Sequence, residues 1–200
     1  MAKICEYYFA PQSPWAYLGH ARLVGMARRY DARIELKPID LAKVFSVSGG
    51  LPLPKRPPQR QAYRLVELQR WRDHLQLPLN LLPKFAPTSG DPAAGLIVAA
   101  KFAHGTDAAL ALTGRIMRAF WAEEQNIADA DTLIALANLA GHDGAALWKS
   151  SQTATVQNEY EQYTGDAIAA SVFGSPWYIV DGESFWGQDR LDFVERALAK

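Results

Sequence analysis

The strand signals of this sequence lie only at its two ends, and this feature most constrains the fold. Residues 4–10 form a short apolar run with three aromatic side chains and no clean alternation, which predicts a strand buried on both faces. Residues 33–39 alternate polar and apolar side chains, as a second strand would. Between them, Ser13 and Pro14 are good residues to begin a helix that runs to about residue 30. The first end therefore predicts a parallel strand–helix–strand unit.

The other end of the chain predicts two further strands and a helix. Residues 177–180 favour a strand, and Asp181-Gly182 is the preferred pair for a two-residue hairpin. Residues 183–186 form the returning strand, and residues 189–199 carry apolar side chains on one helical face.

The middle of the chain contains helical patterns and loops. We expect helices at residues 59–77, 93–104, 107–126, 131–140 and 145–170, a loop at residues 46–58, and an irregular stretch at residues 78–92. The order βαβ…ββα predicts an α/β protein with a thioredoxin fold that an all-helical insertion interrupts. The expected division is a thioredoxin-like domain of residues 1–40 and 171–200 and a helical insertion domain of residues 41–170.

Charge and hydropathy exclude several classes of protein. The chain of 200 residues has 21 basic and 21 acidic side chains, so its formal charge is 21 − 21 = 0, which argues against a nucleic-acid partner. No run approaches the roughly 18 apolar residues of a membrane helix. Glu6 stands where a signal peptide would have its apolar run, and the single cysteine, Cys5, excludes an intrachain disulfide. We therefore expect a cytoplasmic protein without a membrane partner.

Two Ser-Pro pairs are the first candidate site. At Ser13-Pro14 a helix N-terminus would stabilise an anion, although Ser13 alone could equally be a helix cap. Ser175-Pro176 precedes a strand, where a thioredoxin fold commonly has a cis proline that faces the first helix. An ordinary trans turn is the alternative.

A second group of candidates is polar or charged. Gln188 and Asp189 begin the last helix, either as a polar site at its N-terminus or as its cap. A basic cluster is either a solvated helix face or includes one residue that binds a ligand carboxylate; its members are Lys55, Arg56, Arg60, Arg64, Arg70 and Arg72. The four histidines lack the spacing of metal ligands, so we expect no metal.

Four stretches resemble one known family. Residues 8–18 (Tyr-Phe-Ala-Pro-Gln-Ser-Pro-Trp-Ala-Tyr-Leu) are similar to the N-terminal motif of 2-hydroxychromene-2-carboxylate isomerases and kappa-class glutathione transferases. Residues 38–41 resemble the stretch after the second strand of that family, and residues 172–176 and 181–191 resemble its C-terminal signature. The family is related to DsbA-type oxidoreductases, but Ser13-Pro14-Trp15-Ala16 stands in place of their Cys-x-x-Cys. The chain therefore cannot perform dithiol exchange by itself.

The resemblance implies a cofactor and a set of contacts. Glutathione would supply the sulfur, and Ser13 would donate a hydrogen bond to it. The backbone of Ser175, before a cis Pro176, would pair with the cysteine unit of glutathione. Gln188 and Asp189 would hold its γ-glutamyl end, and Arg60 aligns with a basic residue of the family near the tripeptide.

The implied activity is a glutathione-dependent cis/trans isomerisation of aromatic 2-oxo acids during degradation of aromatic compounds. The small aromatic substrate would be isomerised without net consumption of glutathione, and a homodimer is expected. Two alternatives remain open. One is a kappa-like glutathione transferase, and the other is a non-catalytic glutathione-binding module.

Overall fold

Four strands from the two ends of the chain form one mixed sheet. In the computed structural model, which describes residues 2–200, the strand order is β2-β1-β3-β4, with β1 parallel to β2 and the other two pairs antiparallel. The bounds are β1 Ile4–Phe9, β2 Arg33–Pro38, β3 Trp177–Val180 and β4 Glu183–Trp186. Asp181 and Gly182 both have positive φ, as the predicted hairpin turn requires. The expected sheet is therefore confirmed.

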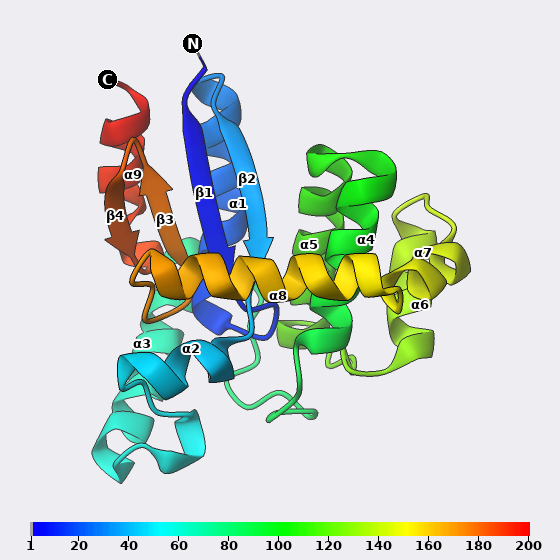
Figure 1. Cartoon of the computed structure of the whole chain (residues 1–200). Helices are drawn as coiled ribbons and strands as arrows, with labels where there is room; N and C mark the ends of the chain where they lie inside the picture. The colour runs from blue at the N-terminus through cyan, green and yellow to red at the C-terminus, as the bar shows by residue number, and fades with distance from the viewer. Residues whose placement is uncertain (1) are drawn as a thin grey trace.

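Helices cover both faces of this sheet. Helices α1 (Pro14–Arg29) and α9 (Leu191–Leu198) pack on one face, while α8 (Ala154–Ala169) crosses the other (Figure 1). Side chains of β1 alternate accordingly: the Tyr7 ring lies 5.9 Å from that of His20 on α1, and Tyr8 faces the opposite side. Both tyrosines are buried, as the nearly continuous apolar run predicted.

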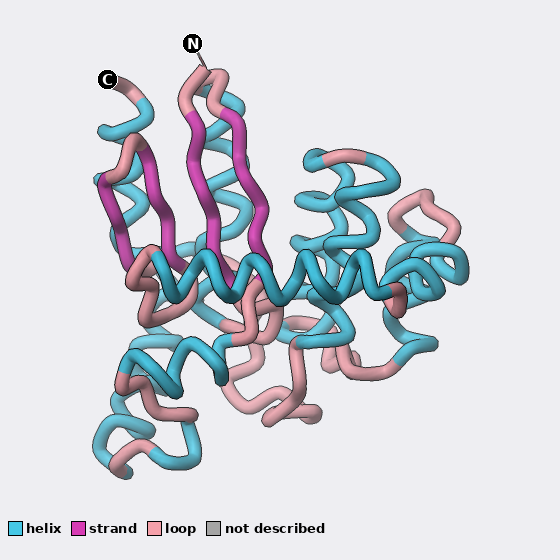
Figure 2. Tube along the Cα trace, in the orientation of Figure 1, coloured by secondary structure: helices cyan, strands magenta, loops and turns pink. Residues whose placement is uncertain are grey.

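The segment between β2 and β3, all of which the structure describes, contains no strand (Figure 2). Its helices are α2 Leu41–Ser48, α3 Pro58–Leu75, α4 Asp91–His104, α5 Thr106–Trp121, α6 Ala130–Leu139, α7 Gly144–Ser151 and α8. The thioredoxin fold with an all-helical insertion is thus confirmed. Within residues 2–200, no helix combines the length and hydropathy that a membrane crossing needs.

The expected single helix over residues 145–170 is wrong, because α7 and α8 are separate. The polar residues at the break explain this. The hydroxyl of Ser151 donates to the carbonyl of Trp148, and that of Thr153 donates to the carbonyl of Ser150, both at 2.7 Å. Such side chains offer the backbone an alternative to the helix.

Two other boundaries also differ from the sequence-based expectation. Helix α2 extends to Ser48, so it covers the start of the expected loop at residues 46–58. It ends at Gly49, whose φ of 75° is the left-handed conformation that favours glycine after a helix. Helix α5 ends at Trp121, five residues before the expected position.

The insertion packs directly on the thioredoxin-like part. Lys101 of α4 donates to the carbonyl of Leu36 on β2 at 3.2 Å. His20 of α1 bonds to the carbonyl of Leu110 on α5 at 3.0 Å. The buried apolar residues of both parts form one continuous core. The start of α1 is therefore held between the sheet and the helical insertion.

Candidate active site

The candidate active site begins where β1 ends and α1 starts. Ser13 is the N-cap of α1, with extended backbone, and Pro14 is the first helical residue. Ser13 is only 6 % exposed. The first turn of α1 contains no acidic residue, so no carboxylate of this turn competes for the positive end of the helix. This end of α1 can therefore stabilise an anion.

The hydroxyl of Ser13 takes part in two hydrogen bonds. It accepts from the backbone N–H of Ala16 at 3.3 Å, which is the capping bond. It also donates to the backbone carbonyl of Ser175 at 3.2 Å. The hydroxyl oxygen accepts a hydrogen bond from the helix, and the hydroxyl hydrogen is donated to the opposite loop. Capping and hydrogen-bond donation by Ser13 therefore do not exclude each other.

Ser175 and Pro176 lie beside Ser13, as the sequence predicted, and the bond between them is cis. The hydroxyl of Ser175 accepts from the backbone N–H of Ala10 at 2.9 Å, so this side chain links the loop to the end of β1. The carbonyl of Pro176 accepts from the N–H of Gly187 at 3.0 Å. The two Ser-Pro pairs and the start of the last helical segment are thus joined by direct bonds.

Gln188 and Asp189 lie in the short 3-10 turn Gln188–Arg190 that leads into α9. Gln188 is 1 % exposed, and its side-chain oxygen accepts from Arg22 of α1 at 2.8 Å. The Asp189 carboxylate is exposed and forms an ion pair with Arg190 at 3.2 Å. The side-chain oxygen of Gln188 is therefore held by Arg22, and its Nε2 is buried without a hydrogen-bond partner among residues 2–200, whereas Asp189 faces solvent.

The basic cluster lies on α3 and on the turn before it. Some of its side chains are exposed and others are half-buried. The side chain of Arg60 is exposed and makes no hydrogen bond or ion pair within residues 2–200. Arg64, one helical turn further, is half-buried with its guanidinium 5.9 Å from the centre of the Trp121 ring. Burial, together with the nearby charge of Arg56, lowers the pKa of Arg64 to about 10. A desolvated cation of this kind gains from binding an anion.

Two residues that shape this region could not be identified from the sequence. Arg22 holds Gln188, but nothing in its local sequence indicates that contact across 166 positions. Gln12, next to Ser13, lies against Gly90 at the start of α4, where a larger residue would collide with its side chain. Both contacts form only when distant segments pack together.

The sulfur of Cys5 lies outside this site. Cys5 is fully buried in β1, and burial, assisted by the charge of Glu6, raises its pKa to about 12. Such a thiol stays protonated and is a poor nucleophile at neutral pH. Within residues 2–200, no three or more His, Cys, Asp or Glu side chains are arranged to hold a metal ion.

The βαβ…ββα fold and the paired Ser-Pro junctions define a thioredoxin-fold protein without a redox cysteine pair. The model of the DSBA-like thioredoxin domain matches residues 4–199, nearly the whole chain. The chain therefore belongs to the DsbA-like thioredoxin family.

Within that family, the similarity is to enzymes that the sequence motifs indicated. The chain is 31% identical, over 99% of both chains, to 2-hydroxychromene-2-carboxylate isomerase of Sphingobium xenophagum. It is 23% identical to human glutathione S-transferase kappa 1, over 100% of this chain and 92% of that one. The solved structure of a 2-hydroxychromene-2-carboxylate isomerase superimposes with a TM-score of 0.83 at 26% identity, and covers 98% of this chain and 94% of that chain. The resemblance drawn from the motifs is confirmed.

Proposed function

We propose that this chain is a glutathione-dependent cis/trans isomerase of aromatic 2-oxo acids, of the 2-hydroxychromene-2-carboxylate isomerase type. The observation that carries the proposal is the buried Ser13 hydroxyl, which lies at a helix N-terminus and beside the cis Ser175–Pro176 bond. The full-length similarity to isomerases supports the same reaction type. We further propose that it acts in the cytoplasm, as a homodimer, in the degradation of aromatic compounds.

The residues at the junction fit a thiol-bearing peptide. Ser13 supplies one hydroxyl donor. The Ala16 and Tyr17 amides bond to Ser13, whereas the Trp15 amide has no hydrogen-bond partner within residues 2–200. The exposed carboxylate of Asp189 suits the ammonium of a γ-glutamyl group, and the cation of Arg60 suits a carboxylate. Since Arg22 bonds to both the side-chain oxygen and the carbonyl of Gln188, we assign the contribution of Gln188 to its backbone N–H.

Glutathione, when bound, supplies a sulfur nucleophile that is released unchanged at the end of each turnover. The chain favours the ionised form of that sulfur. Lowering a thiol pKa by about two units needs about 2.7 kcal/mol. One charge-assisted hydrogen bond from Ser13 contributes about 1.5–3 kcal/mol, and the end of α1 about 0.3–1 kcal/mol. These two contributions suffice without a metal or a histidine.

Ser13 and Ser175 can exchange partners when a ligand binds. Without a ligand, the Ser13 proton is held by the Ser175 carbonyl. If Ser13 turns its proton to the sulfur, the Ser175 carbonyl is released to accept from a peptide N–H. Each buried polar group then keeps a partner, so the exchange avoids the cost of an unpaired buried carbonyl.

The second candidate is a kappa-like glutathione transferase, which the full-length similarity to the human kappa enzyme favours. It would use the same Ser13 site but leave the sulfur on the product. The two functions therefore differ in stoichiometry, because a transferase consumes one glutathione per turnover and an isomerase consumes none.

The test is turnover of 2-hydroxychromene-2-carboxylate with and without glutathione, with free glutathione counted afterwards. We expect isomerisation only with glutathione, and no loss of free glutathione. Stoichiometric loss would establish the transferase instead. Glutathione binding with no reaction, and no lowering of its thiol pKa, would leave only a binding module.

A further inference from the structure

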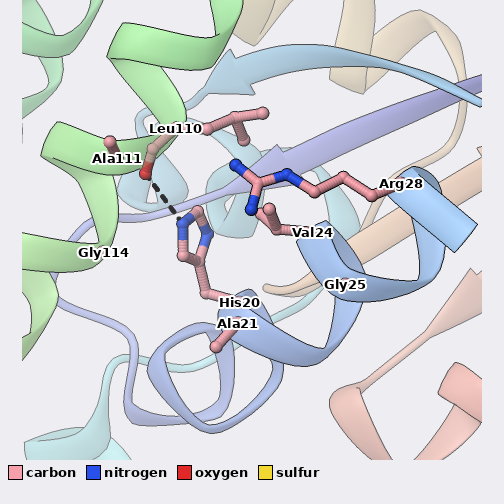
Figure 3. Close-up of a pocket in the computed structure, with 8 residues that line it drawn as sticks. All are labelled: His20, Ala21, Val24, Gly25, Arg28, Leu110, Ala111 and Gly114. Carbon is pink, nitrogen blue, oxygen red and sulfur yellow. Dashed lines mark hydrogen bonds between the residues drawn. The ribbon is translucent and has the colours of Figure 1, made fainter.

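A second pocket, separate from the Ser13 site, lies between α1 and α5 (Figure 3). Its volume is about 280 Å³, and its lining includes His20, Val24, Gly25 and Arg28 from α1 and Leu110 and Gly114 from α5. His20 lies seven residues along α1 from Ser13, about 10 Å at the rise of an α-helix. No residue of this pocket belongs to the candidate active site.

Two glycines make the space between these helices. A Cβ added to Gly25 would meet nothing within 4 Å, so Gly25 leaves the pocket open. A Cβ added to Gly114 would lie 3.2 Å from Cδ2 of His20, so Gly114 makes room for the imidazole. Glycine inside a helix costs about 1 kcal/mol relative to alanine, and both helices tolerate it here.

His20 provides an unused hydrogen-bond acceptor. Its Nε2 lies 3.0 Å from the carbonyl oxygen of Leu110, which can only accept, so Nε2 carries the hydrogen. Burial lowers the pKa of His20 to about 4, so at neutral pH the ring is uncharged and Nδ1 has a free lone pair. Nδ1 is buried and has no hydrogen-bond partner in the part of the chain that the structure describes. Figure 3 shows this nitrogen on the side of the ring that faces Val24 and Arg28.

Arg28 provides a cation at the rim of the pocket. Its side chain is exposed and forms no ion pair or hydrogen bond within residues 2–200. Figure 3 shows its guanidinium extending toward the imidazole of His20. The apolar side chains of Val24 and Leu110 lie nearby. The pocket therefore combines an acceptor, an apolar wall and a cation.

We propose that this pocket binds a small hydroxy acid with an apolar body, of about the size of a hydroxybenzoate. The ligand hydroxyl donates to Nδ1 of His20, its carboxylate binds the guanidinium of Arg28, and its apolar body packs against Val24 and Leu110. This site goes beyond the proposed isomerase activity and does not depend on it.

The probes are 3-hydroxybenzoate and 4-hydroxybenzoate, compared with benzoate and phenol, each titrated into the full chain. The imidazole ¹⁵N resonances are recorded by NMR, and the His20 signals are assigned by their loss in His20→Gln. We expect at least one hydroxybenzoate, and phenol, to shift the Nδ1 resonance, whereas benzoate leaves it unchanged. The hydroxybenzoate should bind more tightly than either partial ligand. Absence of any Nδ1 shift with both hydroxybenzoates would overturn the proposal.

Variants at the pocket test its position. Gly25→Leu fills the open space and should abolish binding, while Gly165→Leu, in an exposed and equally open position of α8, should leave it intact. Arg28→Gln should weaken hydroxybenzoate binding by about 2- to 5-fold, the range for an exposed ion pair, and leave phenol unaffected. Unchanged binding in Gly25→Leu would overturn the proposal. So would binding that Ser13→Ala removes and glutathione displaces, because the ligand would then occupy the other site.

Discussion

At the scale of the residue, the hydroxyl of Ser13 has two roles that the sequence presented as alternatives. Its oxygen caps α1 by accepting from Ala16, and its proton is donated to the carbonyl of Ser175. The cap stabilises the folded chain, whereas the proton is what an anionic sulfur requires. A substitution that keeps the capping acceptor but removes the hydrogen-bond donor can therefore distinguish the two roles.

Replacement of Ser13 should change both stability and thiol ionisation. Ser13→Ala loses the cap, about 1 kcal/mol of unfolding free energy, and the donor. The pKa of bound glutathione should then rise by about one to two units, because about 1.5–3 kcal/mol of anion stabilisation is lost. Thiolate absorbance followed against pH at saturating glutathione measures this shift.

Ser13→Asp is the matched variant, because aspartate caps a helix as well as serine but has no proton to donate when ionised. It should keep near wild-type stability and raise the thiol pKa at least as much as alanine does. If neither variant moves the titration midpoint, Ser13 is only a cap.

Cys5 should be dispensable for turnover. Because it is fully buried in β1 with a raised pKa, it cannot supply the reactive sulfur. Cys5→Ala should cost about 1 kcal/mol of stability, typical of a single substitution, and keep glutathione-dependent activity. A thiol reagent should find no reactive group in the native protein and one after unfolding. An inactive but folded Cys5→Ala variant would show that the sulfur has been wrongly assigned.

At the scale of the element, α8 is attached to the sheet by a charged network. Lys37 of β2 lies between Glu6 of β1 at 2.8 Å and Asp166 of α8 at 3.3 Å, and it also donates to the hydroxyl of Tyr8. Burial alone would raise the pKa of Glu6, but the hydrogen bonds from Lys37 and Tyr8 outweigh it and lower that pKa. The network therefore links the insertion to the sheet most strongly when Glu6 is ionised.

This network predicts a loss of stability in acid. The pKa of Glu6 is lower in the folded chain than in the unfolded one. The contribution of Glu6 to the free energy of unfolding is therefore complete above the ordinary glutamate pKa of about 4.3 and is lost as the pH falls below that value. The unfolding free energy of the wild type should therefore fall more steeply below about pH 5 than that of Glu6→Gln. Urea unfolding at several pH values measures both slopes. Parallel curves for the two proteins would contradict the prediction.

Removal of Lys37, the cation at the centre of the same network, should lower the free energy of unfolding more than loss of an exposed ion pair does. Lys37→Met leaves Glu6 and Asp166 facing each other and should cost about 1–2 kcal/mol at pH 7, less than a fully buried pair because both carboxylates remain partly exposed. Glu35→Gln, which breaks the more exposed pair with Arg33, is the control and should cost less than about 0.5 kcal/mol. Equal costs in the two variants would assign no special role to the network.

At the scale of the whole molecule, the two parts of the sequence share one core. The bonds that cross between the thioredoxin-like part and the insertion include Lys101 to Leu36, His20 to Leu110, and Lys37 to Asp166. The buried apolar residues of both parts are continuous. The division into residues 1–40 with 171–200 and residues 41–170 remains a prediction about sequence organisation, and it does not imply independent stability.

We therefore expect a single unfolding transition. For 200 residues, the calorimetric enthalpy near 60 °C should be about 140 kcal/mol, and it should equal the van't Hoff enthalpy. Differential scanning calorimetry measures both values. Two resolved transitions, or a calorimetric enthalpy well above the van't Hoff value, would mean that the insertion unfolds separately.

The sequence by itself determined the strands, the hairpin and the start of α1, because these depend on signals within a few residues. Asp181-Gly182 supplies two positive φ angles, and Ser13-Pro14 supplies a cap and a preset φ. The motifs around Ser13 and Ser175 also indicated the family and its chemistry. The break between α7 and α8 was missed because a short polar stretch competes only weakly with helix periodicity.

Only the tertiary structure decided which side chains are free to act. Gln188 and Asp189 are neighbours in sequence, yet packing against Arg22 occupies the first and leaves the second exposed. The pocket at His20 likewise depends on Gly114, which is 94 positions away in the chain. Local sequence sets backbone preference over a few residues, but burial and hydrogen-bond partners depend on contacts between distant segments, which form only when the whole chain has folded.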